Sequence, residues 1–577
     1  MTTRRSNGKS RHDPVRHDVP MRQWTILAQD PGVPAADGSA LTTTVSVPAE
    51  RLERGPKGHR VHVIDYDASA DRFYRSRTTG VTSDPFAGVT DIRQLVRDPY
   101  FHQQNVYAIT MATLCEFEGA LGRPVNWGFR DPSHQLKVSP HAFADANAYY
   151  SRDSESLNFG YFSDGSGTLV FTCLSHDIVV HETTHALLDG LRPFYLKPSS
   201  TDQAAFHEGF SDIVALLSVF RSEEVVQKAL APITQKDRRI PLGQLTEEDL
   251  TGTSIAKLAE QMGAALEGVP AAALRESLKI KPDRRHYTSE PFAEEHDRGE
   301  LLVAVVVRAF VKTWLRRLAL RRDDYVGGIN VAVVAEEGAT AARQLLRICI
   351  RALDYLPPVD LTFPDYLSAL LTADLQLYPD DDKYRYRETL TETFASFGIE
   401  PANRDRADGA WDPPCGDFSM AGTHFERMQR DPTEVFRFIW ENRDALCVEP
   451  NAFTRVISVR PVVRVSNDRA ILRETVVEYV QTLKVWANEL AGMGIEKPDG
   501  MRGSRLITLY GGGSLIFDEF GRLKFHITTG VRSTRQSDRL RSLWQRGHFQ
   551  SNDASARIAK MHRDRVLRPV QTLQEGW

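Results

Sequence analysis

Two apolar segments of the chain have helical periodicity, and each carries a pair of ionisable side chains four residues apart. His181 and His185 form the first pair, and Glu208 and Asp212 form the second. Residues four apart on a helix project to the same side, and ionisable groups in buried segments need partners. We therefore expect the two helices to pack against each other with these four side chains between them.

The residue types in these pairs are those of a zinc site. Two imidazoles at this spacing can bind one zinc ion at about 2.0 to 2.1 Å, and a catalytic zinc needs three protein ligands and one open position. His181, His185 and Glu208 supply three ligands, which predicts one zinc ion per chain. Asp212 would accept a hydrogen bond from a ligand imidazole. Glu182, one step around the first helix, would take a proton from metal-activated water as the general base.

A chance match is the competing interpretation, because the motif is short and the chain contains 17 histidines. In that case the first helix only displays two exposed histidines, and the second has an ordinary acidic face. The second helix argues against this, because apolar residues surround its carboxylates and indicate burial. These residues are Ala204, Ala205, Phe206, Phe210, Ile213, Val214, Leu216 and Leu217. His176 and His207 are expected to support the site or lie on the surface, without binding the metal.

Composition indicates a soluble globular protein. Hydrophobic residues make up 41% of the 577 residues, enough for sizeable cores. The net charge of −4 provides no overall attraction for nucleic acid or an acidic membrane, so neither is predicted as a partner. The five cysteines are scattered, which favours a reducing compartment. No signal pattern or apolar run of about 20 residues is present, so we expect a cytoplasmic protein, although leaderless export stays open.

The pattern of elements predicts an α+β fold in five segments. These are a disordered basic tail (1–23), a β-rich lobe (24–176), a mainly helical lobe carrying the zinc site (177–398), a linker (399–417) and an accessory α+β domain (418–577). A β-rich half followed by a helical half places the zinc site between them. Within these segments we expect a helix from Phe101 to Leu121 and a hairpin from Ser514 to Thr528. The basic C-terminal end is either solvated or faces an anionic partner.

The paired motifs resemble those of thermolysin and its relatives, the gluzincins, whose third zinc ligand is the glutamate of an E-x-x-x-D pair. The resemblance runs from about residue 40 to 360, and the matching segments are Asp177-Ile178-Val179-Val180-His181-Glu182 and Glu208-Gly209-Phe210-Ser211-Asp212. It implies a zinc-dependent endopeptidase that acts on peptides or proteins. The resemblance also implies that Asn147 and Ala148 lie on an edge strand that holds the substrate backbone by strand addition.

Further site residues follow from the same resemblance. Tyr195 lies near the position of a tyrosine that donates to the tetrahedral intermediate, and His296 is similar to the family's second donor. Glu294 or Glu295 would orient His296. Arg275 would bind a substrate carbonyl. The alternative for each isolated tyrosine, histidine or arginine is a structural role.

The chain also departs from the family pattern. The zinc motif begins at residue 181, which leaves no room for the family's long propeptide, and Val219 stands where the calcium site needs an acidic residue. These departures argue against propeptide control and calcium dependence. Residues 221–285 form a charged insertion, and the chain after about residue 400 lies outside the resemblance.

Two other functions compete with the endopeptidase. A peptidase scaffold that binds peptides without cleaving them would need no Glu182, so the complete set of residues disfavours it. An aminopeptidase is disfavoured because no G-x-M-x-N motif lies near the site. The sequence does not predict the substrate side chain or the oligomeric state.

Overall fold

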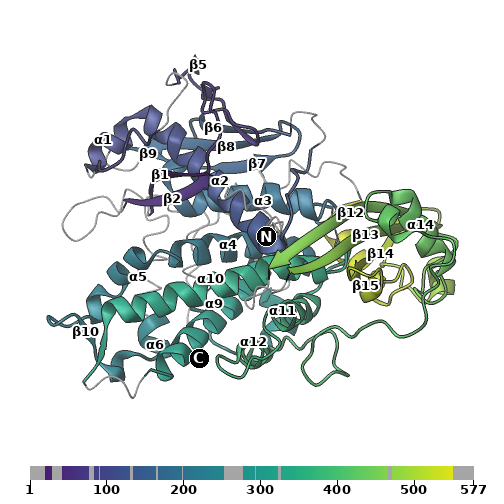
Figure 1. Cartoon of the computed structure of the whole chain (residues 1–577). Helices are drawn as coiled ribbons and strands as arrows, with labels where there is room; N and C mark the ends of the chain where they lie inside the picture. The colour runs from purple at the N-terminus through teal and green to yellow at the C-terminus, as the bar shows by residue number, and fades with distance from the viewer. Residues whose placement is uncertain are drawn as a thin grey trace, which may run out of the picture.

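The computed structural model shows an α+β protein with 43% helix and 21% strand, which confirms the predicted fold class. Two lobes lie one above the other in Figure 1, and a C-terminal sheet lies beside them. The structure describes residues 20–549 with the exception of 29–41, 77–82, 90, 130–133, 164–166, 198, 252–276, 278, 293, 322–326 and 466–470.

The N-terminal lobe is built on a mixed sheet with the strand order β3-β6-β8-β7, and β9 also pairs with β8. These strands are β3 (Val61–Val63), β6 (Leu136–Phe143), β7 (Ala148–Ser151), β8 (Ser156–Ser163) and β9 (Leu169–Phe171). Strands β3, β6 and β8 are parallel, whereas β7 and β9 run antiparallel to β8. Strand β7 therefore ends the sheet as an edge strand.

Two small hairpins and two helices complete this lobe. They are β1 (Met21–Leu27) with β2 (Thr42–Pro48), β4 (Tyr66–Asp67) with β5 (Arg72–Phe73), α1 (Ile92–Arg97) and α2 (Pro99–Leu121). The Asp98 side chain caps α2, and Gly122 ends it in the left-handed region with φ of 71°. Most of α2 is buried, and its bounds confirm the helix expected from Phe101 to Leu121.

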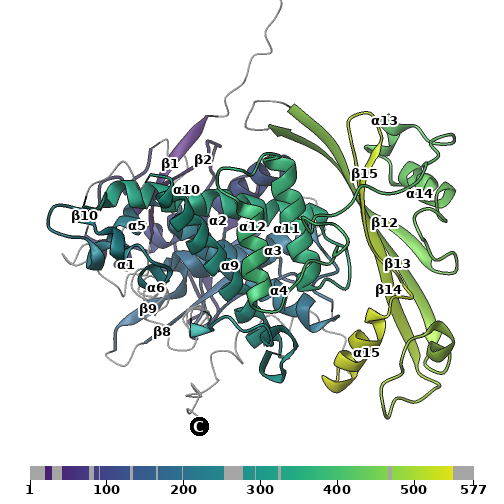
Figure 2. The ribbon, with the colours of Figure 1, turned by 90° about the horizontal axis from the view of Figure 1, so that it is seen from below.

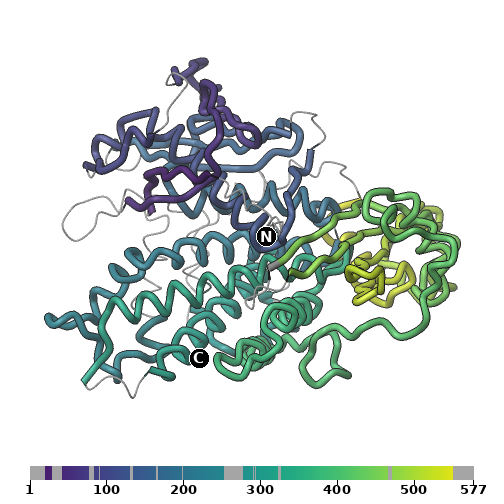
Figure 3. Tube along the Cα trace, viewed as in Figure 1, coloured from purple at the N-terminus to yellow at the C-terminus, as the bar shows by residue number. Residues whose placement is uncertain are grey.

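The helical lobe contains the paired motifs. Its longer helices are α3 (His176–Leu191), α4 (Thr201–Phe220), α9 (Glu295–Ala319), α10 (Val331–Ala352), α11 (Phe363–Leu377) and α12 (Tyr386–Ser396). Its shorter elements are α5 (Glu223–Ala229), α6 (Glu247–Asp249), β10 (Arg239–Ile240) and β11 (Ile329–Asn330). The tube in Figure 3 shows α3 at the junction of the two lobes.

Among the described residues, the C-terminal region forms a four-stranded antiparallel sheet in the order β12-β13-β14-β15, accompanied by α-helices. Its elements are β12 (Phe453–Val465), β13 (Ile471–Trp486), β14 (Leu506–Phe517), β15 (Leu523–Thr529), α13 (Phe425–Met428), α14 (Pro432–Glu441) and α15 (Arg535–Gln545). Strands β14 and β15 pair through Ser514 and Ile527, which confirms the expected hairpin.

The two faces of this sheet belong to different cores. Val476 and Ile516 join the main core of the molecule, whereas their strand neighbours Val477 and Leu515 pack in a separate core with α14. Successive side chains on a strand point to opposite faces, so the sheet lies between the helical lobe and α14, as Figure 2 shows. The accessory segment therefore shares the main core.

Buried charges also join the C-terminal sheet to the lobes. Arg464 on β12 pairs with Asp354 and with Glu474, and all three side chains are buried. Arg192, at the end of α3, pairs with Glu478 on β13 at 3.0 Å. The sheet is thus tied directly to the end of the helix that carries the histidine motif.

The expected tail and linker can be compared with the observed elements. Met21 to Gln23, assigned to the tail, begin β1, while residues 1–19 lie outside the described residues. The expected linker, 399–417, contains no helix or strand, but the indole Nε1 of Trp411 donates to the Tyr355 carbonyl at 2.8 Å. The linker therefore packs on the helical lobe. No helix in the described part of the chain is long and apolar enough to cross a membrane.

Candidate metal centre

Local sequence positions the two helices of the site. Ser175 is the N-cap of α3, and Asp177 lies in the first turn, where a carboxylate is favourable. Gly190, near the end of α3, lies so close to the N-terminal lobe that an added Cβ would be 1.7 Å from the Asn126 carbonyl oxygen. Helix α4 begins after Ser200, whose hydroxyl accepts from the Gln203 amide. The C-terminal end of α3 therefore packs tightly against the N-terminal lobe at Gly190.

The structure brings the three predicted ligands together. One ligand atom from each of His181, His185 and Glu208 lies within 4.8 Å of the others, and all three side chains are buried. Glu208 Oε2 is 3.6 Å from His181 Nε2, and Glu208 Oε1 is 3.4 Å from His185 Nε2. The predicted packing of α3 on α4 through these side chains is confirmed.

The outer nitrogens of the two imidazoles have partners that orient the rings. His181 Nδ1 is 2.8 Å from Asp212 Oδ1, the contact expected from the four-residue spacing. Burial lowers the pKa of His181, but Asp212 and Glu208 outweigh burial and raise this pKa to about 10. His185 Nδ1 lies 2.7 Å from His207 Nδ1. Both rings thus turn Nε2 toward Glu208.

His207 supports the site and is not among the three grouped ligands. Its ring stacks on His185 with centroids 4.8 Å apart, and Ser211 Oγ is a further neighbour of His185 Nδ1 at 3.2 Å. The sequence left open whether His207 lies on the surface, and it is buried. Its position directly before Glu208 was the only sequence signal for this role.

The donor set fits a zinc ion. Two imidazole nitrogens and one carboxylate are common ligands of catalytic zinc, and the contact of His181 Nδ1 with the Asp212 carboxylate is typical of metal-binding histidines. The site also concentrates buried carboxylates, Glu182 and Glu208, which a divalent cation would balance. Zinc itself remains a prediction.

Glu182 connects α3 to the edge strand β7. Its Oε2 accepts a hydrogen bond from the Tyr150 amide on β7 at 2.9 Å, and the side chain is 1% exposed. The Tyr150 hydroxyl donates to Asp189, further along α3, at 2.8 Å. The predicted general base is therefore held beside the histidines and against β7.

The predicted substrate-binding residues lie at the start of this strand. The Asn147 carbonyl accepts from the Gly160 amide at 2.8 Å, and the Asn147 side-chain oxygen accepts from the Ala148 amide at 2.9 Å. Backbone groups two residues apart on a strand face the same edge, so Ala148 shares the outer edge with Tyr150. Ala148 begins the edge strand and Asn147 directly precedes it, and substrate binding by these two residues remains a prediction.

Helix α9, which carries His296, closely approaches α4 beside Glu208. Helices α4 and α9 meet where an added Cβ on Gly209 would be 2.8 Å from the Gly299 carbonyl oxygen, and Gly299 also approaches Glu208. His296 lies one turn before Gly299. Its Nδ1 is 3.0 Å from Glu294 Oε1, whereas its Nε2 is buried and has no hydrogen-bond partner among the described residues. Glu294 is thus the orienting residue.

The remaining predicted residues are placed differently. Glu295, the other candidate orienter, pairs with Arg546 after α15. The buried hydroxyl of Tyr195 donates to the Pro357 carbonyl at 2.7 Å, and its ring packs against Phe206. This placement favours the structural alternative for Tyr195. Arg275 lies outside the described residues.

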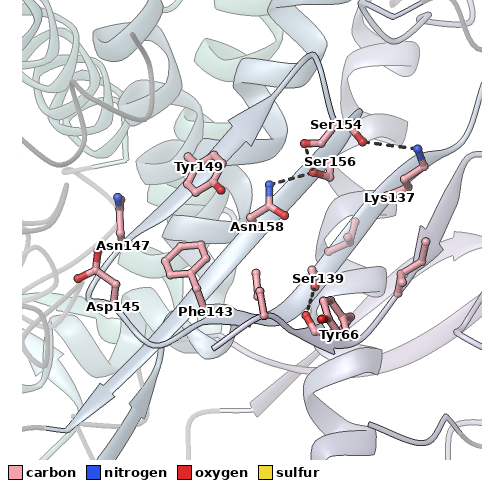
Figure 4. Close-up of a pocket in the computed structure, with 14 residues that line it drawn as sticks. Tyr66, Lys137, Ser139, Phe143, Asp145, Asn147, Tyr149, Ser154, Ser156 and Asn158 are labelled. Carbon is pink, nitrogen blue, oxygen red and sulfur yellow. Dashed lines mark hydrogen bonds between the residues drawn. The ribbon is translucent and has the colours of Figure 1, made fainter. Parts of the chain in front are cut away.

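A cavity of about 470 Å³ on the N-terminal lobe is separate from the metal centre. Figure 4 shows Tyr149 and Asn158 beside it, with Asn147 and Asp145 at one end. Tyr149 points into this cavity, while the adjacent Tyr150 points toward α3. Neighbouring strand residues face opposite sides of a sheet, so the cavity opens on the face away from the zinc ligands.

Comparison of the chain with protein-family models and with curated proteins found no match in either set.

Proposed function

We propose that this protein is a zinc-dependent endopeptidase. The observation that supports this most strongly is the grouping of His181, His185 and Glu208, with Glu182 hydrogen-bonded to the adjacent edge strand. Zinc in such a site would act as a Lewis acid that lowers the pKa of water toward neutrality. The buried surroundings strengthen electrostatic interactions with the reacting groups.

Glu182 is the proposed general base. It would release the Tyr150 amide, accept a proton from the attacking water and pass that proton to the leaving amine. Strand β7 would hold the substrate as an added antiparallel strand along the edge that contains Ala148 and Tyr150. The outer edge of β7 would thus align the peptide next to the general base, Glu182.

His296 is the proposed donor to the developing oxyanion. With Glu294 accepting from Nδ1, an imidazolium would still present an N–H at Nε2. A donor aimed at the charge that develops in the transition state stabilises it more than the ground state. Tyr195 would need to break its bond to Pro357 to share this role.

The test measures zinc content and cleavage of casein in wild type, Glu182→Gln and chelator-treated protein. We expect Glu182→Gln to keep its zinc and lose cleavage by about 10²- to 10⁴-fold, the range of general-base contributions. Glu223→Gln, an exposed residue on α5, is the matched control and should behave as wild type.

The outcomes separate this function from its competitor. Zinc at the three ligands without cleavage of casein or of a peptide library would favour the binding scaffold. Absence of zinc from the purified and zinc-supplemented protein would refute the endopeptidase. Loss of zinc in Glu182→Gln would contradict the division of roles between Glu182 and the ligands.

A further inference from the structure

A second group of metal-binding side chains lies in the N-terminal lobe. His102 is on α2, His141 is on β6, and Cys173 is in the short 3-10 turn η1 (Thr172–Leu174). One ligand atom from each lies within 4.8 Å of the others. None of the three side chains is more than 2% exposed. The proposed peptidase mechanism uses none of them.

Hydrogen bonds at the outer nitrogens determine the tautomers of the two histidines. His102 Nε2 is 2.8 Å from the Val96 carbonyl oxygen, which can only accept, so Nε2 carries the proton. His141 Nδ1 is 2.8 Å from Asp65 Oδ1, and Asp65 Oδ2 accepts from Gln103 Nε2 at 2.8 Å. If Asp65 is an ionised carboxylate it can only accept at Oδ1, and His141 Nδ1 then donates to it.

This arrangement directs His102 Nδ1 and His141 Nε2 at each other, 2.8 Å apart. Two imidazole nitrogens that both carry lone pairs repel at this distance, so a cation must lie between them. That cation is either a proton, which would make an imidazolium of one ring, or a metal ion. Binding of the outer nitrogen to a carboxylate and to a carbonyl is the usual environment of metal-ligating histidines.

The third member of the group favours the metal. A shared proton needs only the two rings, whereas the Cys173 sulfur completes a donor set of two nitrogens and one thiolate that suits zinc. The charges also balance, because one thiolate and the Asp65 carboxylate together neutralise a divalent ion in a fully buried position. Buried charge is costly unless it is compensated in this way.

We propose that His102, His141 and Cys173 bind a second zinc ion with a structural role. The three donors leave one coordination position, which a buried water can occupy. At zinc–nitrogen distances of about 2.0 to 2.1 Å, tetrahedral geometry would open the separation of the two nitrogens by about 0.5 Å. The ring of Phe171 shields the site, because its centroid lies 4.8 Å from that of His102 and 5.4 Å from that of His141.

The position of the group indicates what the ion would do. Turn η1 directly precedes α3, and the Asn105 side chain on α2 donates to the Cys173 carbonyl at 3.0 Å. A metal there would join α2, β6 and the start of α3. The second ion would therefore hold α3 against the N-terminal sheet. This structural role does not depend on peptidase activity.

The experiment counts zinc in a background that lacks the first centre. We expect His185→Ala to retain one zinc per chain, His185→Ala with Cys173→Ser to retain none, and His185→Ala with Cys349→Ser to retain one. Cys349 is the matched control, since it is equally buried but lies on α10. Zinc-free His185→Ala protein after zinc supplementation would overturn the proposal and leave the proton-bridged pair.

Cobalt substitution gives a second measurement that does not require the cysteine variant to fold. The first centre has only nitrogen and oxygen donors, so a thiolate-to-cobalt charge-transfer band would report Cys173. We expect this band in His185→Ala and in Cys349→Ser. X-ray absorption of the zinc-loaded protein should show one zinc–sulfur distance of about 2.3 Å. Folded, cobalt-loaded protein without the band would refute thiolate ligation.

Discussion

The two proposed metal-binding groups are assembled from the chain in opposite ways. Two members of the first, His181 and His185, lie one turn apart on α3, and Glu208 follows on the next helix. The second group combines a helix, a strand and a turn, and its members are separated by tens of residues. The first is a local pattern, whereas the second exists only after folding.

The carboxylates that support the two groups also differ in how far they lie from their partners along the sequence. Asp212 lies four residues after Glu208 on α4 and reaches His181 directly. Asp65, which supports His141, is 76 residues away from it in the sequence. Helical periodicity can therefore predict both the ligands and the supporting residue of the first group. It contains no information about the second, since the register of a sheet and the packing of α2 decide which residues meet.

The largest expected effect comes from removing a proposed ligand of the first group. This change should leave the second group intact. Glu208→Ala should lose one zinc and reduce casein cleavage by about 10³-fold or more, because a metal supplies several kcal/mol of transition-state stabilisation. Zinc analysis and initial rates measure this, with Glu223→Ala as the exposed control. The thiolate–cobalt band should persist. Its loss would show that the two groups are not independent.

The next effect tests which side chain, His296 or Tyr195, donates a hydrogen bond to the oxyanion at the first group. His296→Gln should lower kcat by about 10²- to 10³-fold while zinc content stays constant, as for loss of one oxyanion donor. Tyr195→Phe is the paired variant, and we expect a change of only a few-fold because its hydroxyl is bound to Pro357. Equal losses of kcat in both variants would restore the role that the family resemblance implies for Tyr195.

The third effect compares the two supporting carboxylates. Asp212→Asn and Asp65→Asn should each weaken zinc binding about 10- to 100-fold, the usual result of losing a partner of a ligand imidazole. Competition with a fluorescent chelator would measure both affinities. Each substitution should act only on its own group. An unchanged affinity in Asp65→Asn would remove the main support for the second ion.

The smallest effect tests whether packing of α3 against the N-terminal lobe, in addition to helix formation, helps to position the histidines. Gly190→Ala should destabilise the fold by at least about 1–3 kcal/mol, because the added Cβ meets the Asn126 carbonyl. Gly119→Ala on α2 is the control, since no atom lies within 4 Å of its added Cβ. It should stabilise the helix by up to about 1 kcal/mol. Urea unfolding measures both, and equal stabilities would contradict the close approach.

Sequence patterns could predict many individual helices and strands, but they could not predict how these elements pack together. Apolar periodicity and turn residues predicted α2 and the hairpin of β14 and β15. The shared core of the C-terminal sheet was missed, because Val476 and Val477 are both apolar and no pattern says which face meets the main body. The pairing of Glu295 with Arg546 was missed because it joins residues far apart in the chain.

By itself, the sequence determined the side chains of the first centre that share a helix: His181 with His185, and Glu208 with Asp212. A helix converts a four-residue spacing into a shared face, so local geometry is sufficient. Only the tertiary structure decided that His207 supports His185, that Glu294 orients His296, and that His102, His141 and Cys173 meet. Such contacts depend on how whole elements pack, and packing is set by many weak interactions spread along the chain.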